Sequence, residues 1–452
     1  MPGRWILALI LVVFAISAVR MNAATPYRTA GELHLQRQAD GSRATTQDVG
    51  APDERQHANY VATVLKERSL PVFRPGSSDL YETYQSHQPP LYYILAAGWS
   101  QALGLDPQTQ ADGFRLRLFN TLLGLLTLVG IYSAARWGTG SETSALTAAA
   151  LAGLMPMFVA LHSAVSNDPL LILGCTWSLA LMARVLREGW TVKLALALGL
   201  VMGLSLITKT TALVLLPVAL ILCWQTRESL QPRWVTALVL GLPLLIASPV
   251  WMRNMTLYSD PLAMRAFKEA FVGTAQRKDM MQMVAMMREA NGLAPSGAAA
   301  DYWVNWFGWW TGRSFVGAFG QMDVFFSATV YRVALGLLGL CALGWLLTIR
   351  RAKEEFEPTE RKFHILAATL VGLVCLLFLQ FNLTYFQAQG RYLYPAIAAI
   401  AIGLSVGLLR WIPRSMRVWT PLALVLLMGT ATWLATDYAA HELQLRSVGG
   451  ER

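Results

Sequence analysis

The sequence predicts an all-α polytopic membrane protein with about eleven transmembrane helices and further juxtamembrane helices on the outer face. Three observations carry this prediction. The 452 residues are 55% hydrophobic and 14% charged, whereas soluble domains are roughly 25% charged. Eleven apolar runs approach the roughly 20 residues that cross a bilayer core. The 37 basic and 27 acidic residues give a net charge of +10, which we ascribe to basic cytoplasmic loops rather than to nucleic-acid binding.

Apolar runs and long polar stretches divide the chain into six regions. Residues 1–20 form the first span, 116–251 hold spans two to seven, and 327–437 hold spans eight to eleven. An outer loop at 21–115, a Met- and Trp-rich outer loop at 252–326 and a short outer tail at 438–452 complete the chain. The individual runs are 5–20, 116–135, 143–162, 168–187, 192–207, 210–224, 234–251, 328–348, 363–381, 391–409 and 418–437.

The first apolar run allows two interpretations. Asn22-Ala23-Ala24 offers small residues at which a signal peptide could be cleaved. A clear small-x-small pattern is missing, which favours an uncleaved first helix. In both interpretations the following segment is exported.

The short apolar run 90–105 decides the topology of everything after it. If it does not cross, the short outer loops contain only Lys209 and Arg391, and the basic residues collect inside; if it crosses, they lie outside. Because cytoplasmic loops are basic, 90–105 is expected to lie on or dip into the outer leaflet. By the same rule, 192–224 is two short helices whose turn recesses Lys209. The predicted inner basic residues are Arg4, Arg136, Arg184, Arg187, Lys193, Arg227, Arg233, Arg350, Arg351, Lys353, Arg361, Lys362, Arg410, Arg414 and Arg417.

The first outer loop contains two groups of candidate functional residues. Pro52 followed by Asp53 and Glu54 is a common helix start, in which the acids compensate the helix dipole. Asp53 and His57 stand at i and i+4, which also permits a pair of metal ligands. Spacing offers no third ligand, so no metal site is predicted. His87 lies just before a double proline, where the exported loop returns to the membrane.

Further candidates lie at the outer ends of the predicted spans. Asp168 belongs to an ordinary Asn-Asp-Pro turn, but an acid at membrane depth is also a functional candidate. Lys209 is a stronger candidate because it is recessed without an acidic neighbour in sequence. Arg253 and Arg391, the latter followed by Tyr392, can anchor helix ends by snorkelling or bind an anion.

The order of these motifs resembles the C-superfamily of integral-membrane glycosyltransferases. The resemblance includes protein O-mannosyltransferases, lipid A aminoarabinose transferases and a bacterial group of predicted membrane glycosyltransferases. It implies a polyprenyl-phosphate-linked sugar donor, used on the outer face of the bacterial inner membrane. Asp53 matches the family's catalytic acid and Asp168 its second acid. Where the family often has a basic residue before the double proline, this chain has Gln88, with His87 one position earlier.

The chemistry of such a donor assigns roles to these residues. Loss of the sugar turns the singly charged phosphodiester into a doubly charged leaving group, which fixed cations stabilise; the predicted cations are Lys209, Arg253 and Arg391. Asp53 acts as general base on the acceptor hydroxyl or amine, with Glu54 or His57 orienting it. One displacement inverts the anomeric centre. The predicted substrate-binding residues are Glu54, His57, His87, Lys209, Arg253, Arg391 and Tyr392.

The remaining predictions concern cofactors, partners and the rival class of function. The reaction requires no cofactor, although a divalent cation could assist it. The predicted partners are an acceptor, which is a glycan, a lipid or a protein, and the lipids of the surrounding membrane. A transporter or flippase of a lipid-linked sugar is the alternative. It would typically show repeated halves and would not need the long exported loop at 21–115.

Overall fold

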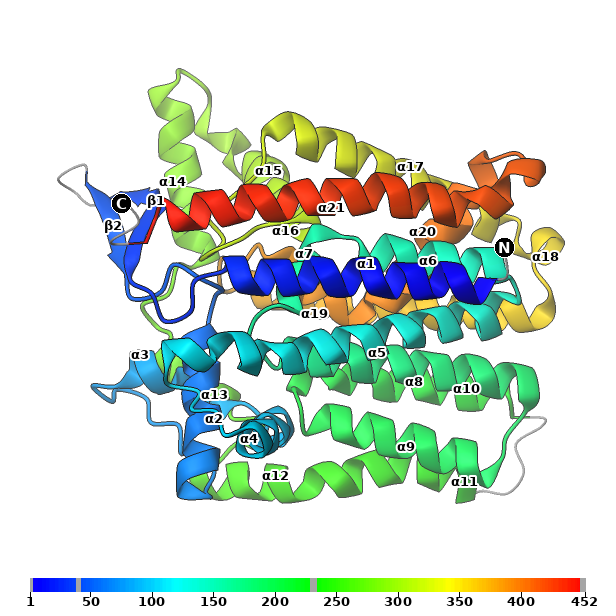
Figure 1. The fold of residues 1–452 in the computed structure, drawn as a ribbon, viewed down its shortest axis with the longest axis horizontal. Helices are drawn as coiled ribbons and strands as arrows, with labels where there is room; N and C mark the ends of the chain where they lie inside the picture. The colour runs from blue at the N-terminus through cyan, green and yellow to red at the C-terminus, as the bar shows by residue number, and fades with distance from the viewer. Residues whose placement is uncertain (1–2, 38–41, 228–233, 448–452) are drawn as a thin grey trace.

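Long helices running side by side dominate the computed structural model, which describes residues 3–37, 42–227 and 234–447 (Figure 1). Arg233 and the last residues of the predicted outer tail lie outside this part. Eight described helices are long and apolar enough to cross a membrane. They are α1 (Gly3–Ala24), η2–α5 (Gln110–Thr139), α8 (Asp168–Glu188), α11–α12 (Trp234–Tyr258), α17 (Ala328–Arg350), α19 (Pro358–Asn382), η7–α20 (Gly390–Trp411) and η8–α21 (Arg414–Gln444).

The three other predicted spans are shorter helices. The stretch 192–224 forms α9 (Val192–Leu206), a 3-10 turn η3 (Thr210–Val214) and α10 (Leu215–Gln225), so the predicted turn at Lys209 is confirmed. The run 143–162 was predicted as one span and is instead broken into α6 (Glu142–Gly153) and α7 (Pro156–Leu161). Pro156 explains the break, because it lacks an N–H group to continue a helix yet suits the first turn of a new one.

Helix α4 (Leu91–Leu103) does not run with the long helices. Figure 1 shows it end-on while they lie in the plane of the view, so it crosses their direction as a surface helix would. It begins directly after the double proline and ends at Gly104, whose φ of 63° suits glycine. The N–H of Leu91 donates to the carbonyl of Ile207 at 3.0 Å, which fastens α4 to the turn after α9.

The elements of the two predicted outer loops gather at one end of the bundle (Figure 1). A two-stranded antiparallel hairpin, which the sequence did not predict, lies there too; its strand β1 also forms a bridge between Gly31 and Ser447 beyond α21. The opposite end carries the N-terminus and α18 (Ala352–Glu355). The outer-loop elements are β1 (Gly31–Arg37), β2 (Arg43–Thr46), α2 (Glu54–Glu67), α3 (Leu80–Thr83), η1 (Tyr84–His87), α13 (Met264–Ala270), α14 (Arg277–Ala290), η5 (Pro295–Gly297), α15 (Ala298–Asp301), η6 (Tyr302–Gly308) and α16 (Trp309–Val316).

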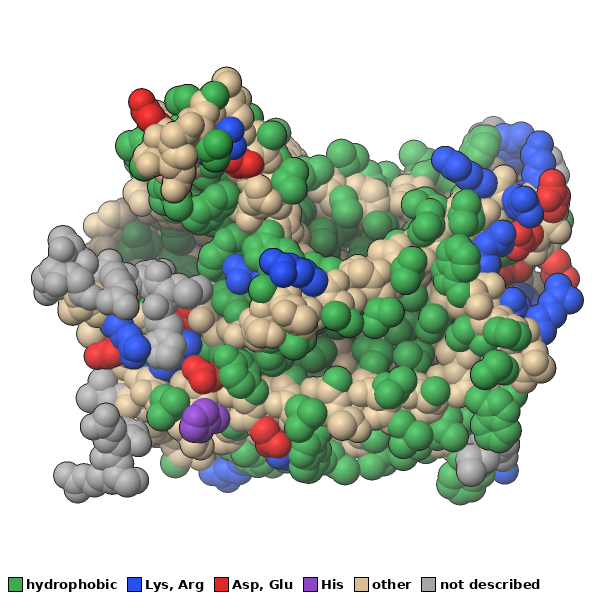
Figure 2. All heavy atoms as spheres, turned by 90° about the horizontal axis from the view of Figure 1, so that it is seen from above, with side chains coloured by type: hydrophobic (Ala, Val, Ile, Leu, Met, Phe, Trp, Pro, Cys, Tyr) green, Lys and Arg blue, Asp and Glu red, His purple; other side chains and the backbone are tan. Residues whose placement is uncertain are grey.

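The distribution of charged side chains follows this division of the bundle into two ends. In Figure 2, charged side chains gather toward the two ends, and hydrophobic side chains cover most of the flank between them. Many of the exposed large hydrophobic residues belong to the long helices, among them Leu427 of α21 and Leu337 of α17. Such a band would be unfavourable in water and is expected of helices that face lipid.

Packing inside the bundle brings the candidate residues to a common level. Helix α5 packs against α8, and both contact α20. Asp168 begins α8, Lys209 precedes η3, and Arg391 lies in η7 at the start of the span that continues as α20. Helix α2 crosses the same end of the bundle (Figure 1). The starts of three spans and of helix α2 therefore meet there.

Candidate active site

Asp53 occupies a backbone conformation that few residues adopt. Its φ of 62° places it in the left-handed region just before α2. Its carbonyl accepts from the N–H of His57 at 3.1 Å, as a residue at a helix start should, but its side chain makes no capping hydrogen bond. Such strained residues concentrate at functional sites. The plain interpretation of Asp53 as a helix-capping acid therefore does not describe its carboxylate.

The Asp53 carboxylate faces a cation and a phenol instead. Oδ1 accepts from the hydroxyl of Tyr84 at 2.5 Å, and Oδ2 accepts from Nη2 of Arg391 at 2.7 Å. Burial raises the pKa of Asp53, but the charge of Arg391 and the Tyr84 hydrogen bond outweigh it and hold the pKa at about 2. Burial and the charge of Asp53 raise the pKa of Tyr84, so the phenol stays a donor. Asp53 is thus fully ionised at neutral pH.

The second predicted acid pairs with the recessed lysine. Nζ of Lys209 lies 2.5 Å from Oδ1 of Asp168, and their side chains are 17% and 11% exposed. The charge of Arg391 also acts on Asp168. The two acid–base pairs consequently form one cluster of two carboxylates and two cations, assembled from the 21–115 loop and three helix ends.

His57 lies within this cluster as an uncharged group. Burial lowers the pKa of His57 to about 3, and the charges of Asp53, Lys209, Asp168 and Arg391 all act on it. Its Nδ1 shares a hydrogen bond of 2.8 Å with the hydroxyl of Tyr93. His57 is therefore neutral at physiological pH and fixed by α4, not by Asp53.

His87 and Gln88 lie beside the lysine end of the cluster. Burial and the charge of Lys209 outweigh the hydrogen bond with the Tyr84 carbonyl and lower the pKa of His87 to about 4. Nδ1 of His87 is 2.5 Å from the carbonyl of Tyr84. The Asn167 amide lies 3.4 Å from both the Gln88 side-chain oxygen and the Thr208 carbonyl. The double-proline motif, the Asn-Asp turn and the Thr-Lys turn thus converge in space.

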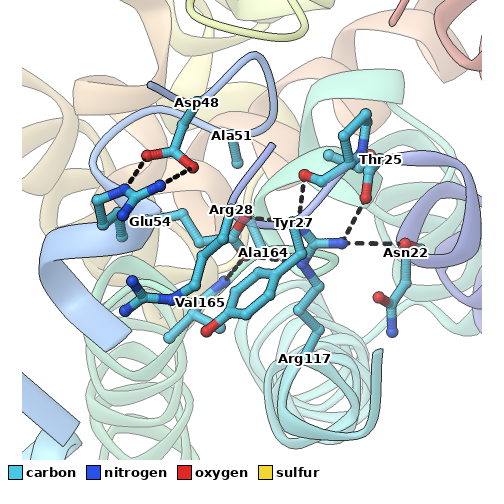
Figure 3. A network of polar contacts seen from close by, with 12 residues as sticks. Asn22, Thr25, Tyr27, Arg28, Asp48, Ala51, Glu54, Arg117, Ala164 and Val165 are labelled. Carbon is cyan, nitrogen blue, oxygen red and sulfur yellow. Dashed lines mark hydrogen bonds and ion pairs between the residues drawn. The ribbon is translucent and has the colours of Figure 1, made fainter. Parts of the chain in front are cut away.

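Glu54 belongs to a different network from its neighbour Asp53 (Figure 3). Its carboxylate accepts from Nε and Nη2 of Arg117 at 2.7 and 2.5 Å, and from the N–H of Val165 at 2.7 Å. Arg117 is 1% exposed and also donates to the carbonyls of Asn22, Thr25 and Pro26. Glu54 therefore ties the Asp53 turn to the end of α1 and to the turn before Asp168.

Neither predicted orienting residue touches the Asp53 side chain by a hydrogen bond. The sequence predicts Glu54 or His57 in this role, but the described partners are Tyr84 and Arg391. The reason is geometric, since the left-handed turn at Asp53 sends consecutive carboxylates in different directions. Tyr84 carried no distinguishing signal in the sequence.

Arg253 and Tyr392 lie at the margin of the cluster. Nη2 of Arg253 donates to the carbonyls of Leu70 and Pro71 at 3.2 and 2.7 Å, so the structure does not bring it to the two acids. The Tyr392 ring lies 5.4 Å from the Arg391 guanidinium and packs near Phe378. It connects Arg391 to an aromatic cluster around Tyr302 and Phe307.

The cluster offers an unpaired cationic donor. Among the described residues, no group of three His, Cys, Asp or Glu side chains is placed to hold a metal ion. Within the described residues, Nε of Arg391 has no hydrogen-bond partner although the side chain is buried. Arg391 therefore has a donor to spare for a ligand.

Comparison with known proteins identifies the fold. The family model of dolichyl-phosphate-mannose-protein mannosyltransferases matches residues 88–252, which include the double proline, Asp168 and Lys209. An oligosaccharyltransferase from Archaeoglobus fulgidus, tethered with an acceptor peptide, is 14% identical with a TM-score of 0.57. That match covers 96% of this chain and 55% of the archaeal chain. The chain has the fold of the C-superfamily of membrane glycosyltransferases.

Two further structures extend the comparison. The same archaeal protein in complex with an inhibitory peptide and a dolichol-phosphate matches with 14% identity and a TM-score of 0.57, over 96% of this chain and 56% of that one. ArnT from Cupriavidus metallidurans bound to undecaprenyl phosphate is 16% identical with a TM-score of 0.48, over 98% and 76% of the two chains. No curated protein matches the chain. This chain spans about half the length of the oligosaccharyltransferase that it matches.

Proposed function

We propose that this integral membrane protein transfers a sugar from a polyprenyl-phosphate-linked donor to an acceptor hydroxyl or amine at the outer face of the bacterial inner membrane. The observation that carries the proposal is the cluster of Asp53–Arg391 and Asp168–Lys209 around neutral His57. It places a carboxylate base beside two fixed cations at one end of a membrane bundle, which is the set of charges that the transfer requires.

The two cations receive the leaving phosphate. When the bond between the sugar carbon and the phosphate oxygen breaks, both electrons stay with oxygen, and the lipid phosphate gains a second negative charge. Preorganised cations in a water-poor site stabilise such a charge strongly. Lys209 supplies a point charge, and Arg391 supplies its unpaired Nε. The Asp168 carboxylate holds Lys209 in place at 2.5 Å before the donor arrives.

Asp53 takes the proton of the acceptor. The acceptor oxygen or nitrogen attacks the anomeric carbon from the side opposite the leaving phosphate, and its proton passes to Asp53, which inverts the centre. A carboxylate with a pKa of about 2 is a weak base. Because the Arg391 charge produces this low pKa, a phosphate that engages Arg391 makes Asp53 more basic. Donor binding and activation of the base are thereby coupled.

Purified protein in nanodiscs, with a panel of polyprenyl phosphosugars, tests the proposal. We expect Asp53→Asn to lose transfer by at least about 100-fold, in the usual range for a general base, while donor binding stays near wild type. Lys209→Met should lower turnover more than tenfold, since the dianion loses one cation. Arg253→Met is the matched control, because Arg253 contacts main-chain carbonyls outside the cluster.

The outcomes separate the proposal from its rival. Normal turnover in both Asp53→Asn and Asp168→Asn would refute the transferase. Loss in Asp168→Asn alone would exchange the roles of the two acids. Movement of a labelled lipid-linked sugar across the bilayer without transfer would favour a transporter.

A further inference from the structure

A small cavity lies next to the Asp53–Arg391 pair. Neither Lys209 nor Asp168 is among the described residues that line it. Its volume is about 40 Å³, and among the described residues it is lined at the catalytic end by Pro52, Ser166 and Arg391. The remainder comes from the end of α1 at Met21, from α7 at Ala160, and from the end of α21 at Leu443. Arg391 donates to Asp53, so the cavity ends beside the proposed base.

The wall offers little hydrogen bonding to a polar ligand. Arg391 is its single charged residue among those described. The Thr25 hydroxyl already donates to the carbonyl of Met21 at 2.8 Å, and the Ser163 hydroxyl donates to that of Val159 at 2.7 Å. Alanine, methionine, leucine and phenylalanine side chains supply much of the rest. A sugar or peptide placed here would lose hydrogen bonds to water without replacement, which is costly.

The cavity is partly open, and its water-accessible volume is about 40 Å³. That is room for roughly three water-sized groups, such as a hydroxyl or amine and the next few carbon atoms, and the rest of an acceptor would lie outside the cavity. Arg391 is 7% exposed and lines the cavity, so a polar end group meets its guanidinium beside Asp53.

We propose that this cavity is the acceptor subsite and that the acceptor is a primary alcohol or amine at the end of an apolar chain, as in a lipid. This inference rests on the proposed function and names the acceptor class that the function left open. The polar end lies against Arg391 and Asp53, and the methylene groups lie between α1, α7 and α21. Lys209 is absent from the described wall, so donor phosphate and acceptor approach the cluster from different sides.

A photoreactive dodecan-1-ol with a diazirine next to its hydroxyl end tests this subsite in nanodiscs without any donor. We expect cross-links to concentrate on peptides containing Met21, Met157 or Leu443. Ala160→Phe should reduce them at least fivefold, and Ala160→Leu should reduce them less. The matched control is Leu427→Phe, at a side chain that is 71% exposed on α21; it should leave the cross-links unchanged. Thermal unfolding of each variant identifies any that fails to fold. If Ala160→Phe does not fold, the smaller reduction of cross-links in Ala160→Leu tests the subsite.

Competition distinguishes the acceptor classes. Excess unlabelled dodecan-1-ol should remove the cavity cross-links, whereas maltose or a serine-containing hexapeptide should not. Protection by the disaccharide or the peptide, or equal labelling in Ala160→Phe and wild type, would overturn the inference. Adding the donor panel separates the two proposals: a cavity that binds the alcohol in a protein that glycosylates nothing refutes the transferase, whereas transfer only to soluble acceptors refutes the lipid subsite.

Discussion

Asp53 and Glu54 are adjacent acids whose surroundings differ completely. The Glu54 side chain is 5% exposed and contacts Arg117 and the N–H of Val165, which fasten segments of the fold together. The Asp53 side chain is 28% exposed, follows a strained backbone and faces Arg391 and Tyr84. One carboxylate is enclosed by its partners, and the other is accessible to a ligand. The difference indicates that Glu54 maintains the position from which Asp53 acts.

The largest effect on stability should come from breaking the Glu54 network. Glu54→Leu leaves Arg117 buried at 1% exposure without its counter-charge, and such a change costs about 3–5 kcal/mol. Chemical denaturation in detergent would measure the loss. Arg117→Met should be comparably destabilising. Wild-type stability in Glu54→Leu would mean that the two acids do not differ as the contacts indicate.

Asp53 should affect stability less than Glu54 does. Asn and Gly both tolerate the left-handed backbone at φ 62°. Asp53→Asn and Asp53→Gly remove one counter-charge of Arg391, but Asp53 is 28% exposed and Asp168 also acts on Arg391. Both variants are therefore expected to lose less stability than Glu54→Leu, although transfer is lost as described above. Denaturation on the same samples as Glu54→Leu gives the comparison directly. Strong destabilisation by Asp53→Asn would assign it a structural role like that of Glu54.

Removing the phenol that contacts Asp53 should alter the base selectively. Tyr84→Phe deletes a hydrogen bond to a charged group, worth about 1.5–3 kcal/mol, that fixes the position of the Asp53 carboxylate. Turnover should fall because the base is less well positioned, even though it becomes more basic. The Asp53 pKa of about 2 should rise, because Tyr84 helps to lower it. Wild-type kcat/KM should therefore show no acid limb from Asp53 above pH 5, and the limb of Tyr84→Phe should begin at a higher pH. An unchanged profile would contradict the contact.

The pH dependence of stability that His57 causes tests whether water is excluded from the Asp53 side of the cluster. Its pKa in the folded protein, about 3, lies below the ordinary 6.5, so the unfolded chain takes up a proton first as the pH falls. Its contribution to stability is full above pH 6.5 and declines toward pH 3, by at most about 1.4 kcal/mol per pH unit. The decline should be shallower in His57→Asn. Parallel pH–stability curves for the two proteins would indicate that His57 is solvated.

The sequence was most informative where a local signal sufficed. Apolar length predicted helices in all eleven runs, of which 143–162 is broken before Pro156, and the turn at Lys209. Asp53, Asp168, Lys209 and Arg391 were singled out, and the structure assembles them. The sequence was less informative where the role of a residue depends on the group that it contacts. Arg253 looked equivalent to Arg391 as an outer cation, yet it caps the carbonyls of Leu70 and Pro71.

Sequence alone determined which segments leave water, because hydrophobic length and proline positions act within a single segment. Tertiary structure alone decided which acid faces which cation. Asp53 and Arg391 are separated by 338 positions, and Glu54 and Arg117 by 63. Their pairing depends on how α2 crosses the ends of α5, α8 and α20. A direct ion pair needs the two charged groups within about 4 Å of each other, so the distances set by helix packing select the partners.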